Sequence, residues 1–451
     1  MVTRISRGWH VLRGLGVIAV GAASLYGAKP ANVLVFYLDD MGWAQPGCYG
    51  GRTVATPAMD AVAKAGVRFT DGYVSACICG PSRVGLMTGR YQARTGHDAN
   101  GNRAGRELLA GETTMAQRLK AAGYATGIVG KWHLGDTTPD FLPRARGFDH
   151  AIGSISNLGE GTFFRDGQKV DDLPGAPVTT PFYRDEAIRF IRERAGQPWF
   201  LYLAFNAVHA PHVASEAWKA RFRHLPQREQ NYAAMIAEAD EAIGRVMETL
   251  RALRLEEDTL VFLISDNGGA APQAEMGGLR GRKWFLWEGG IRVSWIVQWK
   301  GRIPAGKVSG EPVIQLDVLP TALAAAGVEV NPTWQLDGTN LLPLLEGRVE
   351  RLPPRELYFR FGVQYAVRQG DWKLVKASKE MAPMLVNLAT DRAEQVDLAA
   401  REPGRVRELQ GLFDRWNASM QPPRWVDLRW DGDPERKVER REARKAGKKR
   451  K

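Results

Sequence analysis

Two cysteines that stand one residue apart, Cys77 and Cys79, precede the segment Gly-Pro-Ser-Arg in a chain of 451 residues with three cysteines in all. Cysteines this close in sequence cannot form a relaxed disulfide with each other. A zinc site would need a second pair of ligands, which this stretch does not supply. Three cysteines also cannot build a disulfide framework. We therefore expect a special chemical role for one of the two.

Two polar pairs each end a strongly apolar segment that predicts a buried strand. Asp39-Asp40 follows NVLVFYL, and Asp266-Asn267 follows TLVFLIS. In an open parallel sheet, ligands bind beyond the carboxyl ends of the strands. Three carboxylates and one amide oxygen suit Ca²⁺ or Mg²⁺ rather than a thiolate-seeking metal. The alternative is that each pair caps a helix or turn, but two such strand ends favour a metal.

Basic side chains follow two further predicted strands. The run TGIVG leads to Lys131 and His133, and the run FLYLAF leads to His209. A lysine is ordinarily solvated, and a histidine at a strand end is ordinarily paired with backbone. These residues are therefore candidates only because of the motifs that surround them.

The elements that position these residues alternate between strand and helix up to about residue 330. Helices are predicted from Thr56, as N-cap, to Gly66 and over 231–253. This order predicts an α/β fold with a large mixed, mostly parallel central sheet and helices on both faces, within residues 29–350. With 44% hydrophobic and 25% charged residues, the chain is globular.

Past Arg351 the predicted strands become short, and apolar and polar residues alternate along them. Gly370-Asp371 is predicted as a turn between two of these strands. A helix is predicted over 403–420. Residues 351–430 therefore read as a small antiparallel subdomain with one helix. The basic tail 431–451 contains almost no apolar residues, so we expect it to be disordered.

The two ends of the chain carry most of its formal net charge of +12. Residues 434–451 contribute +7 and the leader contributes +3, which leaves +2 for the body. Nucleic-acid recognition is therefore not expected, because the charge lies in a tail and not on a patterned face.

Residues 1–28 have the pattern of a secretory signal peptide, with basic residues, the apolar run LGVIAVGAASL and small residues after it. The run is short for a membrane span, although a buried first helix or an uncleaved anchor is the alternative. We expect export to the periplasm or beyond, without stable membrane insertion.

The segment from Cys79 to Arg90 matches the signature C-x-P-S-R-x-x-L-x-T-G-R. On this motif the chain resembles the type I, arylsulfatase-like sulfatases of the alkaline phosphatase superfamily. The resemblance covers roughly residues 31–400, through segments that include NVLVFYLDDMGW, GKWHLG, FNAVHAPH, SDNGG, LRGRKWFLWEGGIRV and AVRQGDWKLV.

The resemblance implies that a maturation enzyme oxidises Cys79 to Cα-formylglycine, with Cys77 as a bystander. The hydrated aldehyde offers two hydroxyls on one carbon, one to attack sulfur and one to expel sulfate. It also implies a cation, Ca²⁺ in preference to Mg²⁺, held by Asp39, Asp40, Cys79, Asp266 and Asn267.

The resemblance further implies a role for each of the remaining catalytic residues. Arg83 would hold the hydrated aldehyde, and Lys131 and Lys283 would neutralise the sulfate oxygens. His209, alone or together with Lys283, would protonate the leaving alcohol. His133 would act as base in the elimination.

Near the motif, the stretch YQARTGHDAN departs from relatives that often carry Pro-His before Arg-Thr-Gly. His97 is an additional polar residue there, and we hypothesise that it contacts substrate. Trp284, Trp287 and Trp334 are candidates for a sugar subsite, with core packing as the alternative.

The predicted function is hydrolysis of a sulfate monoester of a carbohydrate or an aryl alcohol. One alternative is a phosphate or phosphonate monoester hydrolase, because both tetrahedral anions fit one cleft. The other is a non-catalytic polyanion-binding protein that acts through its tail. The implied partners are a sulfated small molecule or glycan and the maturation enzyme. The sequence does not indicate an oligomeric state.

Overall fold

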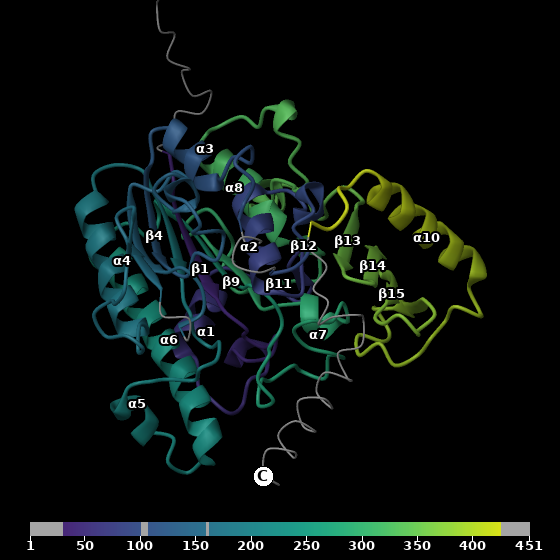
Figure 1. The fold of residues 1–451 in the computed structure, drawn as a ribbon, viewed down its shortest axis with the longest axis horizontal. Coiled ribbons are helices and arrows are strands. Elements are labelled where there is room, and N and C mark those ends of the chain that lie inside the picture. The colour runs from purple at the N-terminus through teal and green to yellow at the C-terminus, as the bar shows by residue number, and fades with distance from the viewer. Residues whose placement is uncertain (1–29, 101–106, 159–161, 425–451) are drawn as a thin grey trace, which may run out of the picture.

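The computed structural model describes residues 30–100, 107–158 and 162–424. The predicted signal peptide and the tail 431–451 lie outside the described residues. A ten-stranded sheet forms the centre of the larger part of the molecule (Figure 1). In spatial order its strands are β11 (Lys307–Ser309), β2 (Val67–Phe69), β10 (Trp295–Gln298), β9 (Thr259–Ser265), β1 (Asn32–Leu38), β8 (Trp199–Ala204), β4 (Ala125–Gly130), β5 (His150–Ser154), β6 (Phe163–Arg165) and β7 (Gln168–Val170).

The middle of this sheet is parallel and both flanks contain antiparallel strands. Strands β9, β1, β8, β4 and β5 run parallel to their neighbours within this group. Strand β10 is antiparallel to β9 and β2, and β6 is antiparallel to β5 and β7. The predicted large mixed, mostly parallel sheet is confirmed.

Side chains of β1 alternate between two separate cores, as the twofold period of a strand requires. Val33 and Val35 pack into one core with α2 (Cys79–Thr88), α3 (Met115–Ala121) and α8 (Val318–Ala325). Leu34 and Phe36 pack into the other with α1 (Pro57–Lys64), α4 (Thr180–Arg194) and α6 (Gln227–Ala252). The sheet is therefore covered on both faces, which explains why β1 has no polar side chain between Val33 and Leu38 apart from a tyrosine hydroxyl.

Shorter elements complete the larger part. Helix α5 (Glu216–Ala220) packs on α6, and α9 (Leu342–Leu345) packs beside α8. Strands β3 (Gly72–Tyr73) and β12 (Val313–Ile314) pair in parallel, and α7 (Glu288–Ile291) precedes β10.

A four-stranded antiparallel sheet lies at the C-terminal side of the molecule (Figure 1). The last helix of the described chain, α10 (Pro403–Ala418), packs on one face of this sheet, where Phe413 of the helix and Leu374 of the sheet belong to the same apolar cluster. The sheet and helix fall within the predicted subdomain 351–430, and Gly370-Asp371 forms the predicted two-residue turn. The elements are β13 (Glu356–Phe361), β14 (Gln364–Gln369), β15 (Trp372–Lys376), β16 (Met384–Asn387) and α10 (Pro403–Ala418).

The other face of the small sheet joins the larger part around a buried ammonium group. Lys373 of β15 is fully buried, and its Nζ donates to the carbonyl oxygen of Leu286 (2.9 Å). The same Nζ lies 2.8 Å from a carboxylate oxygen of Glu288 and 2.8 Å from one of Glu394. Lys373 thus lies between two buried carboxylates at the junction, and Arg292 also pairs with one of them, Glu288.

Replacing Lys373 with methionine should destabilise the protein strongly, because two buried carboxylates lose their common cation. Removing one partner of a buried ion pair costs about 3–5 kcal/mol. Urea unfolding of Lys373→Met measures this, with Lys300→Met as control because Lys300 pairs with Glu256 at the surface. Equal midpoints for the two variants would contradict this account of the junction.

Thr56 is the N-cap residue of α1, as predicted, but its side chain does not cap the helix. The Thr56 hydroxyl oxygen accepts from the backbone N–H of Gly47 and makes no cap bond to the helix. Asp240 of α6 caps α1 instead, accepting from the N–H groups of Ala58 (3.0 Å) and Met59 (2.8 Å). A cap supplied by a distant helix cannot be identified from the local sequence.

Stability should depend on pH through Asp240, whose pKa burial raises to about 6. Because this lies above the ordinary value near 4, the contribution is largest below about pH 4 and is lost as the pH rises through about 6. The unfolding free energy of the wild type relative to Asp240→Asn should therefore fall by up to about 3 kcal/mol between about pH 4 and pH 7. Urea unfolding across this range, with exposed Asp185→Asn as control, checks it. A difference that rises with pH would refute the assignment.

Candidate active site

The polar pairs predicted at strand ends meet because their strands are neighbours in the sheet. Leu38 of β1 pairs with Ser265 of β9, so the residues that follow them emerge side by side. Helix α2 begins at Cys79, directly over this edge. The side chains of Cys79 and of the acidic residues are all buried. The sheet topology thus brings residue 79 to the acidic cluster.

Cys79 lies against the carboxylates of the first pair. Its Sγ is 3.5 Å from Oδ1 of Asp39 and 4.0 Å from Oδ1 of Asp40. The backbone N–H of Asp40 donates to Oδ1 of Asp266 (3.1 Å), which ties the two strand ends together. One ligand atom each from Asp39, Asp40, Cys79 and His209 lie within 4.8 Å of one another.

Two buried lysines reach the same cluster from different loops. Lys131, which follows β4, donates from Nζ to Asp39 and to Oδ1 of Asn157 (2.8 Å). Lys283 places its Nζ 2.6 Å from Oδ1 of Asp40 and 3.0 Å from Sγ of Cys79. Both lysines are therefore at the site and not in solvent, which was the alternative for each.

Arg83, one turn after Cys79 on α2, is fully buried beneath the cluster. Its guanidinium donates to Oδ2 of Asp266 (2.8 Å), the Tyr202 hydroxyl (3.0 Å) and the carbonyl oxygen of Lys131 (3.2 Å). These contacts orient the carboxylates and the loop of Lys131. The predicted contact of Arg83 with a hydrated aldehyde at residue 79 stays a prediction.

The two predicted proton-transfer histidines occupy different surroundings. Nε2 of His209 lies 3.5 Å from Oδ2 of Asp40, and its side chain is 19% exposed. Burial lowers the pKa of His209, although the Asp40 charge acts in the opposite direction. His133 is buried, with φ of 63° and its N–H donating to the carbonyl of Ile155. Only His209 thus combines nearness to the acids with an exposed edge.

The donor set fits a hard divalent cation. Oδ1 of Asn267 is buried without a hydrogen-bond partner, while its Nδ2 donates to Asp40 (2.7 Å). Burial and the neighbouring charge of Asp39 raise the pKa of Asp266 to about 7. An orphaned amide oxygen beside crowded carboxylates is the environment that a bound cation would satisfy.

The thiol of Cys79 is poorly suited to act as a nucleophile itself. Burial raises its pKa well above the ordinary range of a cysteine, and Lys131 and Lys283 only partly offset this. Because the thiolate is the reactive form, an unmodified Cys79 would be inert. Cys77 is also buried, within the apolar cluster that joins the small sheet to the larger part, consistent with its predicted role as a bystander.

The loop that carries His97 is fixed to the C-terminal subdomain. Asp98 forms a buried ion pair with Arg360 of β13 (2.6 Å), and Asn100 accepts from the backbone N–H of Gly80 (3.0 Å). His97 is 1% exposed, and burial, reinforced by the positive charge of Arg424, lowers its pKa to about 3. A substrate contact by His97 stays a prediction.

Sequence reasoning missed three residues that support the site. Asn157 contacts Lys131, Tyr202 contacts Arg83, and Asn100 caps the start of α2, where Ile78 offers no side-chain acceptor. Tyr202 lies inside the buried strand β8, and both asparagines lie in loops without periodicity. No local pattern distinguishes such residues from ordinary core or loop positions.

Two of the three tryptophans proposed from the sequence for a sugar subsite, Trp287 and Trp334, lie in packed surroundings. Trp287 is buried, with the guanidinium of Arg280 3.7 Å from its ring centre. Trp334 is half-buried, with Arg118 of α3 4.0 Å from its ring centre. These contacts favour packing over a sugar subsite for both.

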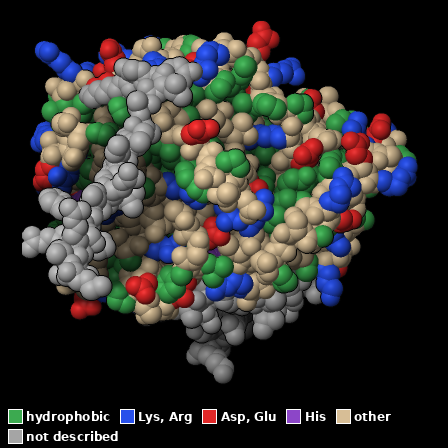
Figure 2. Space-filling model, turned by 90° about the horizontal axis from the view of Figure 1, so that it is seen from above, with side chains coloured by type: hydrophobic (Ala, Val, Ile, Leu, Met, Phe, Trp, Pro, Cys, Tyr) green, Lys and Arg blue, Asp and Glu red, His purple; other side chains and the backbone are tan. Residues whose placement is uncertain are grey.

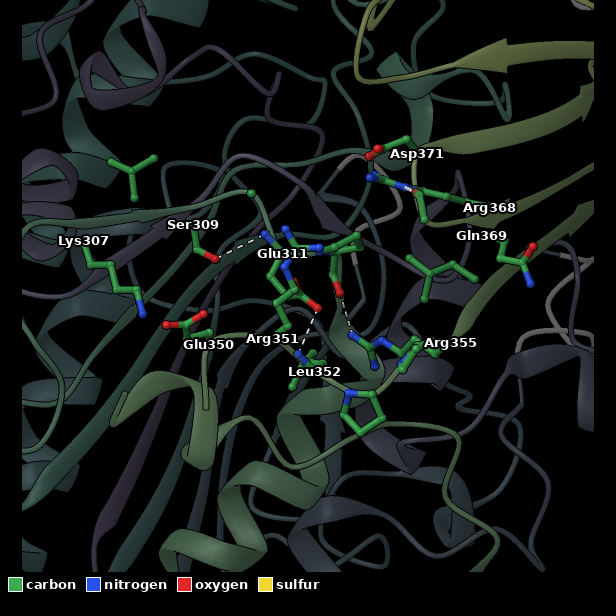
Figure 3. A pocket seen from close by; sticks show the side chains of 17 residues that line it. Lys307, Ser309, Glu311, Glu350, Arg351, Leu352, Arg355, Arg368, Gln369 and Asp371 are labelled. Atoms are coloured by element: carbon green, nitrogen blue, oxygen red, sulfur yellow. Dashed lines mark hydrogen bonds between the residues drawn. The ribbon is translucent and has the colours of Figure 1, made fainter. Parts of the chain in front are cut away.

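A cavity of about 640 Å³ lies apart from the acidic cluster, between β11, residues 350–355 and the β14–β15 turn (Figure 3). Two of its basic residues are already paired, Arg355 with Asp317 and Arg368 with Asp71. None of the residues that line it belongs to the acidic cluster, so it is not the catalytic centre.

Charged side chains of both signs are interspersed over the face in Figure 2, without a broad basic patch. This agrees with the nearly neutral body expected from the sequence. Among the described residues, no helix is both long and apolar enough to cross a membrane.

Comparison with known proteins agrees with this geometry. The sulfatase family model matches residues 31–328. N-acetylgalactosamine-6-sulfatase of Sus scrofa is 36% identical, over 81% of this chain and 75% of that protein. Steryl-sulfatase of Mus musculus is 32% identical, over 80% of this chain and 73% of that protein.

A solved structure, Ps i-CgsB in complex with k-i-k-neocarrahexaose, is similar with a TM-score of 0.81 and 29% identity, covering 92% of this chain and 97% of its own. The matched range contains Cys79, both acidic pairs, Lys131 and Lys283. The chain therefore belongs to the sulfatase family, among the type I sulfatases of the alkaline phosphatase superfamily, and is an enzyme that hydrolyses sulfate esters.

Proposed function

We propose that this sulfatase uses a Cα-formylglycine made from Cys79, together with a bound Ca²⁺, to hydrolyse a sulfate monoester on a carbohydrate. The observation that carries the proposal is the position of the Cys79 Sγ, 3.5 Å from Asp39 and 3.0 Å from Lys283. A side chain at this point contacts both the carboxylates that suit a cation and a lysine that suits an anion.

The cation would be held by Asp39, Asp40, Asp266 and Asn267, completed by the modified residue 79. When bound, Ca²⁺ lowers the pKa of a coordinated hydroxyl and polarises a sulfate oxygen. A set of carboxylate and amide oxygens favours Ca²⁺, which accepts about six to eight oxygen ligands in variable geometry, over the smaller, strictly octahedral Mg²⁺. A hydrated formylglycine supplies one hydroxyl to attack sulfur and a second to release sulfate.

The chain's own residues would provide the anion site. Three carboxylates, of Asp39, Asp40 and Asp266, face three cations, of Arg83, Lys131 and Lys283. A divalent cation would leave this buried site with surplus positive charge, which suits an anionic ester. Lys131 and Lys283 are fixed before substrate arrives, so they stabilise charge on the sulfate oxygens without reorganisation.

Proton transfer would fall to the two histidines. His209 is partly exposed and lies within 3.5 Å of Asp40, so it is placed to protonate the leaving alcohol. His133 would take the proton from residue 79 when sulfate is released. Arg83 would keep Asp266 and the loop of Lys131 in place for both steps.

A carbohydrate substrate is supported by the relatives. One is an N-acetylgalactosamine-6-sulfatase, and a solved relative is in complex with k-i-k-neocarrahexaose. We also propose that the leader directs export to the periplasm or beyond, and that a maturation enzyme modifies Cys79. An aryl sulfate is a suitable test substrate, because it has the same ester group and a chromogenic leaving group.

Replacing Cys79 with alanine should abolish turnover of an aryl sulfate while leaving thermal unfolding nearly unchanged, because the nucleophile is lost and the fold is not. The matched control is Cys77→Ala, which should retain kcat. Mass spectrometry of the peptide that spans residue 79 in the wild type should show an aldehyde in place of the thiol. Substantial activity of Cys79→Ala, or a wild type active with an unmodified thiol, would overturn the mechanism. A faster aryl phosphate reaction would instead favour the phosphatase alternative.

Chelation of divalent cations should abolish activity, since the buried carboxylates would lose the cation that they bind in common. Added Ca²⁺ should restore activity more fully than Mg²⁺. Asn267→Ala removes one neutral donor without changing charge, so it should need a higher Ca²⁺ concentration for half-maximal activity and a smaller Ca²⁺-dependent rise in melting temperature. Unchanged Ca²⁺ dependence of this variant would exclude Asn267 as a ligand.

A further inference from the structure

Trp284, directly after Lys283, has a backbone conformation that a bulky residue rarely adopts. Its φ is 79°, and the left-handed region costs a non-glycine residue about 1–2 kcal/mol. Asp40 and His133, both residues of the site, also have positive φ. Strain of this kind persists where surrounding structure over-determines it, and it gathers at functional sites.

Neighbouring elements fix the Trp284 backbone on both sides. Its N–H donates to the carbonyl oxygen of Cys77 (3.0 Å), two residues before the nucleophile position. Its carbonyl oxygen accepts from Nε2 of Gln364 at the start of β14 (2.9 Å). The same Gln364 side chain accepts from the N–H of Leu286 (3.1 Å). The indole ring is therefore held on a rigid backbone.

The ring lies next to the reacting groups. Nζ of Lys283 is 5.5 Å from the centre of the Trp284 ring and 3.0 Å from Sγ of Cys79. Trp284 is only partly buried and rests against the apolar cluster that joins the small sheet to the larger part. A large aromatic face one lysine away from the nucleophile position is suited to contact the organic part of a substrate.

We propose that Trp284 forms the leaving-group subsite, where its ring stacks against the ring of the sulfated alcohol, either a pyranose or an aryl ring. This inference rests on the proposed function, because the sulfate must be held by Lys283 beside residue 79. An aromatic side chain offers a broad apolar contact with few rotatable bonds. The anion site alone recognises sulfate, so Trp284 would add affinity only for esters with a ring.

Three substitutions separate stacking from backbone strain. Trp284→Ala removes the ring and keeps the strain, Trp284→Gly removes both, and Trp284→Phe keeps an aromatic face. For p-nitrophenyl sulfate, KM should rise about five- to tenfold in the alanine and glycine variants and stay near wild type with phenylalanine. The inhibition constant of inorganic sulfate, which has no ring, should change less than about twofold in all three.

A purely structural role would give a different pattern. In that case the KM for p-nitrophenyl sulfate would be higher in the alanine variant than in the glycine variant. The inhibition constant of inorganic sulfate would rise in parallel with KM. Either result, or an unchanged KM in the alanine and glycine variants, overturns the proposal. Trp334→Ala is the matched control, because its ring contacts Arg118 of α3 and should leave both constants unchanged.

Binding to an inactive background distinguishes failure of this inference from failure of the proposed mechanism. In Cys79→Ala, p-nitrophenyl sulfate should bind about five- to tenfold more tightly than it does in Cys79→Ala combined with Trp284→Gly. Calorimetric titration measures this without turnover or maturation. If the wild type proves inactive with a formylglycine present, the proposed mechanism fails, and the titration still decides the role of Trp284.

Discussion

The structure depends on the balance of charge around residue 79. Three buried carboxylates crowd the ends of β1 and β9, and three buried cations from α2 and two loops face them. Charges of either sign alone would be too costly to bury. Each group therefore requires the others, and the sheet edge, the start of α2 and the loops of Lys131 and Lys283 must be assembled together. The fold serves to hold this arrangement away from bulk water.

The C-terminal subdomain contributes to this assembly through contacts that position segments of the site. Lys373 lies between two carboxylates at the junction, and Gln364 holds the segment after Lys283. Arg360 fixes the loop that carries Asn100, which in turn caps the helix of Cys79. Two of the segments that reach the site are thus positioned by residues 80 and 262 positions away in the sequence.

The parts predictable from sequence are those that depend on local pattern. The apolar runs before Asp39 and Asp266 indicated buried strands. Because parallel strands end at the same edge of a sheet, the sequence predicted that the two polar pairs lie close together. The cap of α1 by Asp240, the contact of Asn157 with Lys131 and the burial of Tyr202 against Arg83 did not follow, because each joins segments brought together only by tertiary folding. The short antiparallel strands β6, β7 and β10 were likewise too brief to show a period. Arg83 lies beside the acidic cluster, but its contacts with Asp266 and Tyr202 could not be foreseen from its motif.

The link between Gly80 and Asn100 has a consequence for inherited or engineered changes at the far end of the chain. A Cβ added to Gly80 would lie 2.8 Å from the Asn100 side-chain oxygen, so any larger residue at position 80 requires the Asn100 side chain to shift. The loop before Asn100 is also bound by backbone hydrogen bonds from Gln421 and Arg424. Truncation of the chain before Gln421 would remove both hydrogen bonds and would consequently disturb the loop that supports the start of α2, even though it deletes none of the residues proposed to touch the ester.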